Sequence, residues 1–437
     1  MPTTMQIVPD IPICQQDLPL DRYQPEFAPY AEEYLALPDR LPETVLPWMD
    51  GYIRPALAAL GDRVMLLAHY YMGGEIVKLV ERYGGQVADS YQLALQAVRH
   101  PERKIFVESA VHFMAEAIAI LAAADQEVWI TNPKAGCTME MLAKDFMVEP
   151  VFDELHARYG DDLLVVAYMN TSGRVKAMAG RTGGAVCTSS NAKAIVEWAV
   201  RQDRKIFFVP DRHLGDVVAG WVGIPPAELF HWGGGVEGGQ QSIQVLPAAE
   251  RDRLDRARMV LWGAFCGVHT VFKPAHVEYW RARGYRVLVH PECPKPVVDV
   301  ADGAGSTAYL WNAVATAAPG SRLAIATEGH FVRNAREQGA LRGVEVVNMA
   351  DIPSPEFGAL GCGCATMSRN DPPHLVAILD LLRQGRGPDL NRVLPGDAVD
   401  EITGVRERLS PDAQAELARE ARRALDQMIA ITEGRAH

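Results

Sequence analysis

Three segments of this chain repeat one order of residue types, and each copy ends in a cysteine. A copy begins with a short apolar run that ends in polar residues, and a small hydroxyl residue that opens a helix follows. A second apolar run ends in a carboxylate and a histidine, and a last apolar run precedes the cysteine. The three cysteines are Cys137, Cys266 and Cys364. Chance does not readily place four kinds of feature in one order three times, so we expect three copies of one folding unit.

The residues at matching points of the repeat differ in type but not in order. The polar stretches are His69-Tyr70-Tyr71, Tyr168-Met169-Asn170 and His290-Pro291-Glu292. The hydroxyl residues are Ser90, 21 positions after His69, Ser189, 21 after Tyr168, and Thr307, 17 after His290. The carboxylate and histidine pairs are Glu108 with His112, Asp211 with His213, and Glu328 with His330. Each copy therefore carries a similar set of reactive side chains.

The alternation of strand and helix patterns predicts the fold class. Short apolar runs alternate with segments of helical periodicity, such as Ala192, Ile195, Val196 and Ala199 on one face. Parallel αβα layers give this alternation. We predict an α/β fold of three αβα (Rossmann-like) repeats related by a pseudo-threefold axis. Because ligands of open parallel sheets bind beyond the carboxyl ends of the strands, those ends should converge on one central site that contains the cysteines.

The chain length of 437 residues suits about three domains of roughly 100 residues. We expect an N-terminal arm at 1–59, repeats at 60–147, 148–283 and 284–370, and a helical tail at 371–437. Residues 1 to about 45 are rich in proline and acid, which predicts an extended segment along the surface or a partly disordered one. The Gly-rich insertion near 222–256 predicts a surface loop, and the tail is expected to pack against the outside.

Charge, hydropathy and cysteine content exclude several classes of function. The net charge of −12 and the lack of a Lys/Arg run argue against a nucleic-acid partner. No apolar stretch approaches the roughly 18 residues of a membrane span, and Met1 to Cys14 lack the pattern of a secretory signal. Seven thinly spread cysteines are typical of reduced thiols, structural ones in the case of Cys14 and Cys187. We therefore expect a cytoplasmic protein.

The three repeat cysteines are candidate metal ligands. They are too far apart in sequence to form the local pairs of a zinc ribbon or ferredoxin, so only the fold can bring them together. Thiolates favour zinc or iron–sulfur, and three of them leave one coordination position open, as in catalytic centres. The alternative for any single cysteine is a buried apolar side chain. Repeat geometry does not decide between Cys362 and Cys364 as the third ligand.

The polar residues at the first strand ends are candidates for acid–base catalysis on a small polar substrate. They are His69, Tyr71, Tyr168, Asn170, His290 and Glu292. The alternative for each is a polar group that is satisfied at a strand end. Glu292 beside His290 is the most suggestive pair, because either group can shift the pKa of the other.

The hydroxyl residues Ser90, Ser189 and Thr307 occupy positions typical of helix N-caps. Helix N-termini also bind anions, so an anionic substrate could be held there without many arginines. The histidines His112, His213 and His330 are predicted to orient loops through the nearby carboxylates. His269, three residues after Cys266, is a stronger functional candidate because it must lie beside the metal.

Several stretches together resemble the quinolinate synthase family, in order, over about residues 60 to 370. They are Ala68-His69-Tyr70-Tyr71, Val111-His112-Phe113-Met114-Ala115-Glu116, Ala135-Gly136-Cys137, Tyr168-Met169-Asn170-Thr171-Ser172, Cys187-Thr188-Ser189-Ser190-Asn191, Pro210-Asp211-Arg212-His213-Leu214-Gly215, Cys266-Gly267-Val268-His269, His290-Pro291-Glu292-Cys293 and Gly305-Ser306-Thr307. The set is specific as an ensemble, although no single stretch would be.

The resemblance implies condensation of iminosuccinate with dihydroxyacetone phosphate to quinolinate, with release of phosphate and water, in NAD biosynthesis. It also implies a [4Fe–4S] cluster held by Cys137, Cys266 and Cys364, with one open iron that acts as a Lewis acid. In that family a short Met- and Asn-containing stretch follows the third ligand, which favours Cys364 over Cys362, although Ala365 stands where a proline is usual. An L-aspartate oxidase or dehydrogenase that produces iminosuccinate is the implied functional partner.

The positions of these residues, together with the resemblance, suggest hypotheses about their individual roles. Glu292 is expected to be the leading general base, His69 and Tyr71 to handle protons at the triose end, and His269 to act in catalysis beside the cluster. The expected substrate-binding residues are His69, Ser90, Tyr168, Met169, Asn170, Ser189, His290, Pro291, Glu292 and Thr307. Two rival functions are a non-catalytic iron–sulfur sensor and a three-cysteine zinc hydrolase, the latter a colourless protein.

Overall fold

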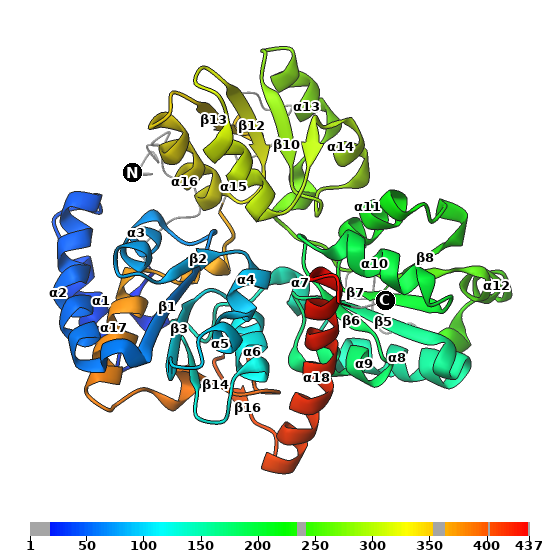
Figure 1. The fold of residues 1–437 in the computed structure, drawn as a ribbon, viewed down its shortest axis with the longest axis horizontal. Helices are drawn as coiled ribbons and strands as arrows, with labels where there is room; N and C mark the ends of the chain where they lie inside the picture. Colours follow the sequence, from blue (N-terminus) through cyan, green and yellow to red (C-terminus); the bar gives the residue numbers. More distant parts are fainter. Residues whose placement is uncertain (1–17, 234–241, 353–362, 401–402, 436–437) are drawn as a thin grey trace, which may run out of the picture.

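The computed structural model describes residues 18–233, 242–352, 363–400 and 403–435, and they form three lobes that meet near the centre of the molecule (Figure 1). Each lobe is built on one mainly parallel β-sheet with helices packed against it. The prediction of an α/β fold is confirmed. All six residues of the strand Leu163–Tyr168 are buried, as expected for a strand covered on both faces.

The first lobe, mainly blue, cyan and orange in Figure 1, has the strand order β14-β4-β3-β1-β2. Only the β14–β4 pair is antiparallel. The strands are β1 (Val64–His69), β2 (Gln86–Ala88), β3 (Ile105–Ser109), β4 (Glu127–Ile130) and β14 (Arg392–Val393). The helices are α1 (Ala28–Leu35), α2 (Pro42–Leu60), α3 (Gly74–Arg82), α4 (Ser90–Ala94), α5 (Gln96–Arg99), α6 (His112–Leu121) and α17 (Pro372–Arg383).

Both ends of the chain contribute to the core of this lobe. Residues 1–17 lie outside the described part, but from residue 28 onward the predicted extended arm is the helices α1 and α2, with Phe27, Met49 and Ile53 fully buried. That prediction was wrong because an apolar helical face outweighs a high proline content when it can pack. Helix α17 packs against α2, and β14 adds a strand to the sheet. The tail is therefore not confined to the outside.

The second lobe, green in Figure 1, has the all-parallel order β6-β5-β7-β9-β8. The strands are β5 (Leu163–Tyr168), β6 (Ala185–Cys187), β7 (Lys205–Val209), β8 (Leu229–Trp232) and β9 (Met259–Trp262). The helices are α8 (Asp145–Tyr159), α9 (Gly173–Arg181), α10 (Ala192–Arg201), α11 (Arg212–Val222) and α12 (Ala248–Arg256). Between the first and second lobes lies the short helix α7 (Thr138–Met141).

The insertion near 222–256 is not the simple surface loop that its glycines predict. It contains the edge strand β8, whose Trp232 is buried, and the helix α12. Residues 234–241, which hold all of the two glycine runs except Gly233, lie outside the described residues. The prediction failed because the apolar residues before those runs pair with β9 and complete the sheet.

The third lobe, yellow-green in Figure 1, has the parallel order β11-β10-β12-β13. The strands are β10 (Arg286–Val289), β11 (Gly303–Ala304), β12 (Arg322–Ala326) and β13 (Glu345–Asn348). The helices are α13 (Pro274–Arg281), α14 (Lys295–Val300), α15 (Thr307–Thr316) and α16 (Gly329–Ala340). In all three sheets the first strand in the chain lies between the second and the third. The pseudo-threefold relation of the lobes stays a prediction.

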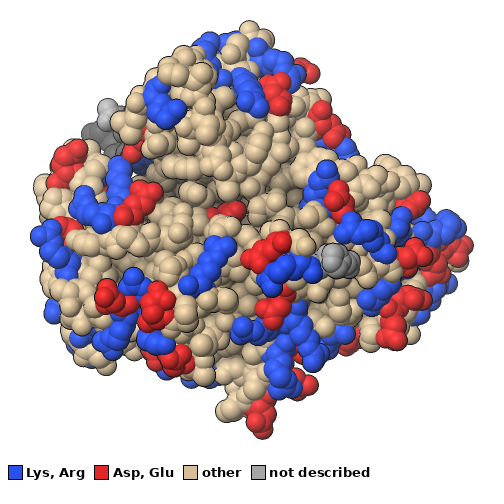
Figure 2. Space-filling model, viewed as in Figure 1, with Lys and Arg blue, Asp and Glu red and all other residues tan. Residues whose placement is uncertain are grey.

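Helix α18 (Pro411–Thr432), red in Figure 1, runs between the first two lobes and packs against α6, α9 and α10. The small strands β15 (Ala398–Val399) and β16 (Arg406–Glu407) pair just before it. The third lobe contacts the first through α16 and α3 and the second through α14 and α11. Among the described residues, no helix combines the length and the apolar character needed to cross a membrane. Figure 2 shows acidic and basic side chains interspersed over one face.

Candidate active site

One cavity receives residues from all three lobes. It encloses about 520 Å³, counting its opening to solvent. The predicted site residues that line it are His69, Tyr71, Ser90, Cys137, Tyr168, Asn170, Ser189, Cys266, His290, Glu292, Thr307 and Cys364. Three predicted residues do not line it: Met169, Pro291 and His269 are buried behind its wall. Six residues of this set lie at or just after the carboxyl ends of β1, β5 and β10: His69, Tyr71, Tyr168, Asn170, His290 and Glu292. They lie at the cavity because parallel strands end at one edge of a sheet.

Each of the three cysteines begins a helical turn. In every case the cysteine carbonyl accepts a hydrogen bond from the backbone N–H four residues later: Met141 to Cys137 (2.9 Å), Thr270 to Cys266 (3.1 Å) and Ser368 to Cys364 (2.9 Å). The turns belong to α7 and to the short helices His269–Val271 and Met367–Arg369. The three thiols thus reach the cavity on similar local structures.

The environment of the thiols suits a bound cation. Burial raises the pKa of all three, and the charges of Glu292 and of neighbouring thiols add to this effect for Cys137 and Cys266. A cation would reverse it, because metal ions bind the thiolate form. The Asn170 amide also donates to the Cys137 Sγ at 3.7 Å. Three soft donors at one cavity fit an iron–sulfur or zinc group. Cys362, the competing third ligand, lies outside the described residues.

Two histidines at strand ends have the same local geometry. The Tyr71 backbone N–H donates to His69 Nδ1 at 3.2 Å, and the Glu292 backbone N–H donates to His290 Nδ1 at 3.3 Å. Burial lowers the pKa of both rings to about 3, so they are neutral at neutral pH. A neutral ring that accepts at Nδ1 carries its proton on Nε2. Both histidines therefore have an Nε2–H donor to offer.

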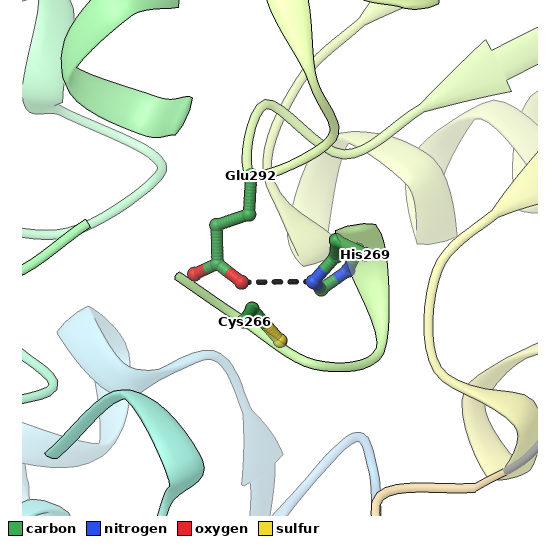
Figure 3. Close-up of side chains that lie close together, drawn as sticks. All are labelled: Cys266, His269 and Glu292. Atoms are coloured by element: carbon green, nitrogen blue, oxygen red, sulfur yellow. Dashed lines mark ion pairs between the residues drawn. The ribbon is translucent and has the colours of Figure 1, made fainter. Parts of the chain in front are cut away.

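Glu292 is surrounded by polar groups of two lobes. The Tyr168 hydroxyl donates to its Oε1 at 2.5 Å, and His269 Nδ1 lies 2.8 Å from its Oε2, an ion-pair distance drawn as a dashed line in Figure 3. The His269 ring stacks on His290 with 4.6 Å between centroids. Burial opposes ionisation of Glu292, but His290, His269 and Tyr168 outweigh it and lower the pKa of this carboxyl to about 2. Glu292 is therefore a carboxylate at neutral pH.

A chain of polar contacts extends from Glu292 to the first lobe. His269 Nε2 lies 3.1 Å from the hydroxyl of Thr327, which lies 2.9 Å from the hydroxyl of Tyr71. Burial, followed by the charge of Glu292, holds the pKa of the Tyr71 and Tyr168 hydroxyls well above the ordinary value. Both phenols therefore stay protonated and can donate.

Sequence reasoning missed Thr327 and the apolar part of the cavity wall. Thr327 directly follows β12 and is buried. Its position before the Glu328–His330 pair is the only signal that could have found it. The apolar lining residues include Val111, Phe113, Met114 and Met367, which stand beside motif residues. The sequence does not indicate whether an apolar residue beside a motif faces a cavity or the core.

The N-cap prediction for the three hydroxyl residues was wrong. Asp89 caps α4 and Ser306 caps α15, so Ser90 and Thr307 are the first helical residues instead. Ser189 lies before Asn191, the residue that precedes α10. The Thr307 hydroxyl donates to the Tyr71 hydroxyl at 3.5 Å. Because neighbouring residues carry the caps at α4 and α15, the hydroxyls of Ser90 and Thr307 are free to face the cavity.

The second set of histidines is less uniform than predicted. His330 Nδ1 contacts the Glu328 carboxylate at 2.8 Å, as expected. His213 instead contacts the Thr270 hydroxyl, at 3.5 Å. His112 is buried, and its Nε2 has no partner among the described residues. A shared position in the repeat does not give these rings a shared partner.

A smaller group within the site could hold a single metal ion. One donor atom each from Cys266, His269 and Glu292 lies within 4.8 Å of the other two. Figure 3 shows Cys266 and His269 on one loop, with Glu292 pointing toward them from another. Such a mixed sulfur, nitrogen and oxygen set is compatible with zinc.

Comparison with known proteins shows which family the chain is similar to. Residues 55–403 match the family model described as quinolinate synthetase A protein. The quinolinate synthase of Geobacillus kaustophilus is 34% identical over 88% of this chain and 93% of its own length. That of Acidobacterium capsulatum is 37% identical over 81% of this chain and 89% of its own, and that of Staphylococcus carnosus is 32% identical over 93% and 100%. The chain belongs to the quinolinate synthetase A family.

Proposed function

We propose that this enzyme condenses iminosuccinate with dihydroxyacetone phosphate to quinolinate, releasing phosphate and water, as a step of NAD biosynthesis. Relatives named quinolinate synthase match nearly their whole length. The observation that carries the proposal is the cavity itself, since three thiols and the Glu292 contacts share it. A non-catalytic iron–sulfur sensor would need the thiols but not the acid–base groups beside them.

The cofactor we propose is a [4Fe–4S] cluster held by Cys137, Cys266 and Cys364. Three protein ligands would leave one iron open, and the bound cluster would supply a Lewis acid to the cavity. The matching strand order of the three sheets supports a pseudo-threefold arrangement of the lobes around it. Asn170, whose amide contacts the Cys137 sulfur, would lie between the cluster and the substrate.

Substrate binding would rely on neutral donors rather than on arginines. The hydroxyls of Ser90, Ser189 and Thr307 line the cavity, and Thr307 stands at the N-terminus of α15, where free backbone N–H groups favour an anion. The Nε2–H groups of His69 and His290 would donate to carboxylate or phosphate oxygens. Met169 and Pro291, which lie behind the wall, would contribute by shaping the strand ends. A phosphate and two carboxylates could thus enter a net acidic protein.

Proton transfer would centre on Glu292. Its carboxylate is the form that a general base requires. Tyr71 and Tyr168 keep their protons: Tyr71 would act as a donor to a developing oxyanion, and Tyr168 would hold the carboxylate of Glu292. His269 would connect Glu292 to Thr327 and Tyr71, which gives a removed proton a path toward the other side of the cavity. His69 and Tyr71 would serve the triose end of the substrate.

The substrates imply a supplier of iminosuccinate, such as an L-aspartate oxidase or dehydrogenase. The compartment we propose is the cytoplasm, since the cysteines that the structure describes all carry free thiols. Nucleic acid is not a proposed partner, because basic side chains are mixed with acidic ones on the face shown in Figure 2.

Anaerobic reconstitution with iron and sulfide tests the proposal. The loaded protein should be brown and should form quinolinate from the two substrates. Serine at position 137, 266 or 364 should abolish the iron–sulfur absorption, because two thiolates are too few to hold the cluster. Cys187→Ser is the matched control: this thiol is buried away from the cavity and should be dispensable. A brown protein that forms no quinolinate would contradict the proposed activity and would favour the non-catalytic iron–sulfur sensor.

The Cys266, His269 and Glu292 group favours zinc as the second candidate cofactor. A zinc hydrolase would be colourless, and its activity would return with zinc alone. Elemental analysis of the purified protein separates the two cases. One zinc per chain without iron or sulfide, and activity restored by zinc, would reject the cluster.

A further inference from the structure

The carboxylate of Glu328 lies directly behind Cys364. Its Oε1 accepts the backbone N–H of Cys364 at 2.8 Å and also contacts His330 Nδ1 at 2.8 Å. Its Oε2 accepts the backbone N–H of Phe331 at 2.9 Å, which caps α16. Glu328 is completely buried. The backbone of Cys364 is thereby tied to the start of α16 by a charge-assisted hydrogen bond.

Gly363 packs against the same pair of side chains. A Cβ at this position would lie 2.7 Å from two atoms of the His330 ring and 2.9 Å from Glu328 Oε1. Real Cβ contacts are longer, so any larger residue would push the backbone away from the pair. The hydrogen bond from Cys364 and the position of Gly363 therefore both show that this backbone lies close to Glu328 and His330.

The equivalent carboxylates of the other repeats allow a comparison. Asp211, the equivalent in the second repeat, is completely buried, its Oδ1 accepts the backbone N–H of Leu214 at 2.7 Å, and its Oδ2 has no hydrogen-bond partner among the described residues. Glu108, the equivalent in the first repeat, is also completely buried, but neither of its oxygens has a partner among the described residues. The chain thus contains two glutamates at matching positions, one joined to a cysteine and one not.

We propose that Glu328, held by His330, is a positioning residue that fixes the backbone of Cys364 so that its thiol faces the cavity. The inference rests on the proposed function in one respect, because that function makes Cys364 a cluster ligand. Residues that hydrogen-bond to metal-binding groups orient them, and their loss typically weakens metal binding by about 10- to 100-fold. Glu328 would act in this way through the backbone of Cys364, the proposed cluster ligand.

The first measurement uses the protein without its cluster. The Cys364 ratio is the rate at which iodoacetamide alkylates Cys364 divided by the rate for Cys137 in the same molecule. This ratio should be about tenfold higher in Glu328→Ala than in the wild type, because loss of the hydrogen bond frees the backbone of Cys364 and exposes its thiol. Mass spectrometry of the cysteine peptides gives this ratio. Gly363→Ala should raise it as well, since the added Cβ displaces the backbone from the other side. Glu108→Ala is the matched control: it removes a buried glutamate without a cysteine contact and should leave the ratio unchanged.

The second measurement uses the reconstituted holoenzyme. A ferrous chelator should remove iron about tenfold faster from Glu328→Ala and Gly363→Ala than from the wild type or Glu108→Ala. Circular dichroism checks that each variant is folded. If Glu328→Ala does not fold, Gly363→Ala alone decides.

The proposal stands if both variants raise the Cys364 ratio and the iron-release rate while Glu108→Ala raises neither. Any other pattern among folded variants overturns it. A wild-type protein that binds no iron–sulfur cluster would contradict the proposed function separately, because the alkylation ratio does not depend on the cluster.

Discussion

Glu292 is the residue on which the polar contacts of the cavity converge. Its oxygens contact Tyr168, at the end of β5, and His269, in the loop after β9. Through His269 and Thr327 the contacts continue to Tyr71 in the first lobe. The charge of one carboxylate is therefore held by groups from different parts of the chain, and a change at Glu292 should affect the chemistry more than the fold.

We expect Glu292→Gln to keep the cluster while it lowers the rate of quinolinate formation by about 10²- to 10⁴-fold, the range of general acid–base groups. The amide keeps the size of the side chain and removes only its ability to take a proton. Turnover under anaerobic conditions, with iron content measured in parallel, checks this. Glu108→Gln makes the same chemical change outside the cavity and should retain normal turnover. Near-normal turnover of Glu292→Gln would remove Glu292 as the base and leave His69 or Tyr71.

Glu108 should make the stability of the protein depend on pH. Burial raises the pKa of its carboxyl from 4.5 to about 8, so the folded protein holds a proton that the unfolded chain releases. Its contribution is fully present below about pH 4.5 and is lost as the pH rises to about 8, with a slope of up to about 1.4 kcal/mol per pH unit.

Glu108→Gln removes this titration. We expect the free energy of unfolding of the variant, relative to wild type, to rise steadily between about pH 5 and 8. Urea unfolding at several pH values measures the difference. A difference that does not change with pH would show that Glu108 is ionised in the folded protein.

At the scale of elements, the N-terminal helices are part of the first lobe and not an appendage. Helix α2 packs against α17, from the other end of the chain, and both contribute to one apolar core. The composition of residues 1 to about 45, rich in proline and acid, predicted an extended or partly disordered arm, because such segments usually bury little apolar surface. The buried face of α2, which includes Met49, Ile53 and Ala56, outweighed that tendency.

Ile53→Ala should therefore destabilise the protein by about 2–5 kcal/mol, because it leaves a cavity between α2 and its neighbours. Chemical denaturation of the whole protein measures the loss. Arg54→Ala, on the exposed side of the same helix, should change stability by no more than about 0.5 kcal/mol. Equal effects of the two substitutions would mean that α2 does not pack in solution.

At the scale of the whole molecule, the proposed cluster lies where the lobes meet, whereas each sheet has apolar residues of its own. Oxygen should therefore damage the site before it affects the fold. In air we expect activity and the iron–sulfur absorption to fall while the circular dichroism of the helices stays constant. Full activity after hours in air, with the iron still bound, would contradict a catalytic open iron.

The sequence alone determined the features that depend on local order. The apolar runs and the residues that end them predicted the strands and their polar ends, because strand and helix periodicities are properties of neighbouring residues. The repeated order of residue types also identified the three cysteines, and the motifs that resemble the family are stretches of neighbouring residues. Most of the polar residues that line the cavity followed as well, since the carboxyl ends of parallel strands meet at one edge, but its apolar wall did not.

Only the tertiary structure decided which groups contact one another. Tyr168 and Glu292 are separated by 124 residues and Tyr71 and Thr327 by 256, so no periodicity links them. The helical arm and the edge strand β8 likewise depend on packing between segments that are distant in the sequence. Local preferences amount to less than about 1 kcal/mol for most residues and to about 3 kcal/mol for a proline inside a helix, such as Pro47 or Pro55 of α2, whereas each buried apolar side chain contributes about 1.5–3 kcal/mol. Where the two disagreed, burial prevailed.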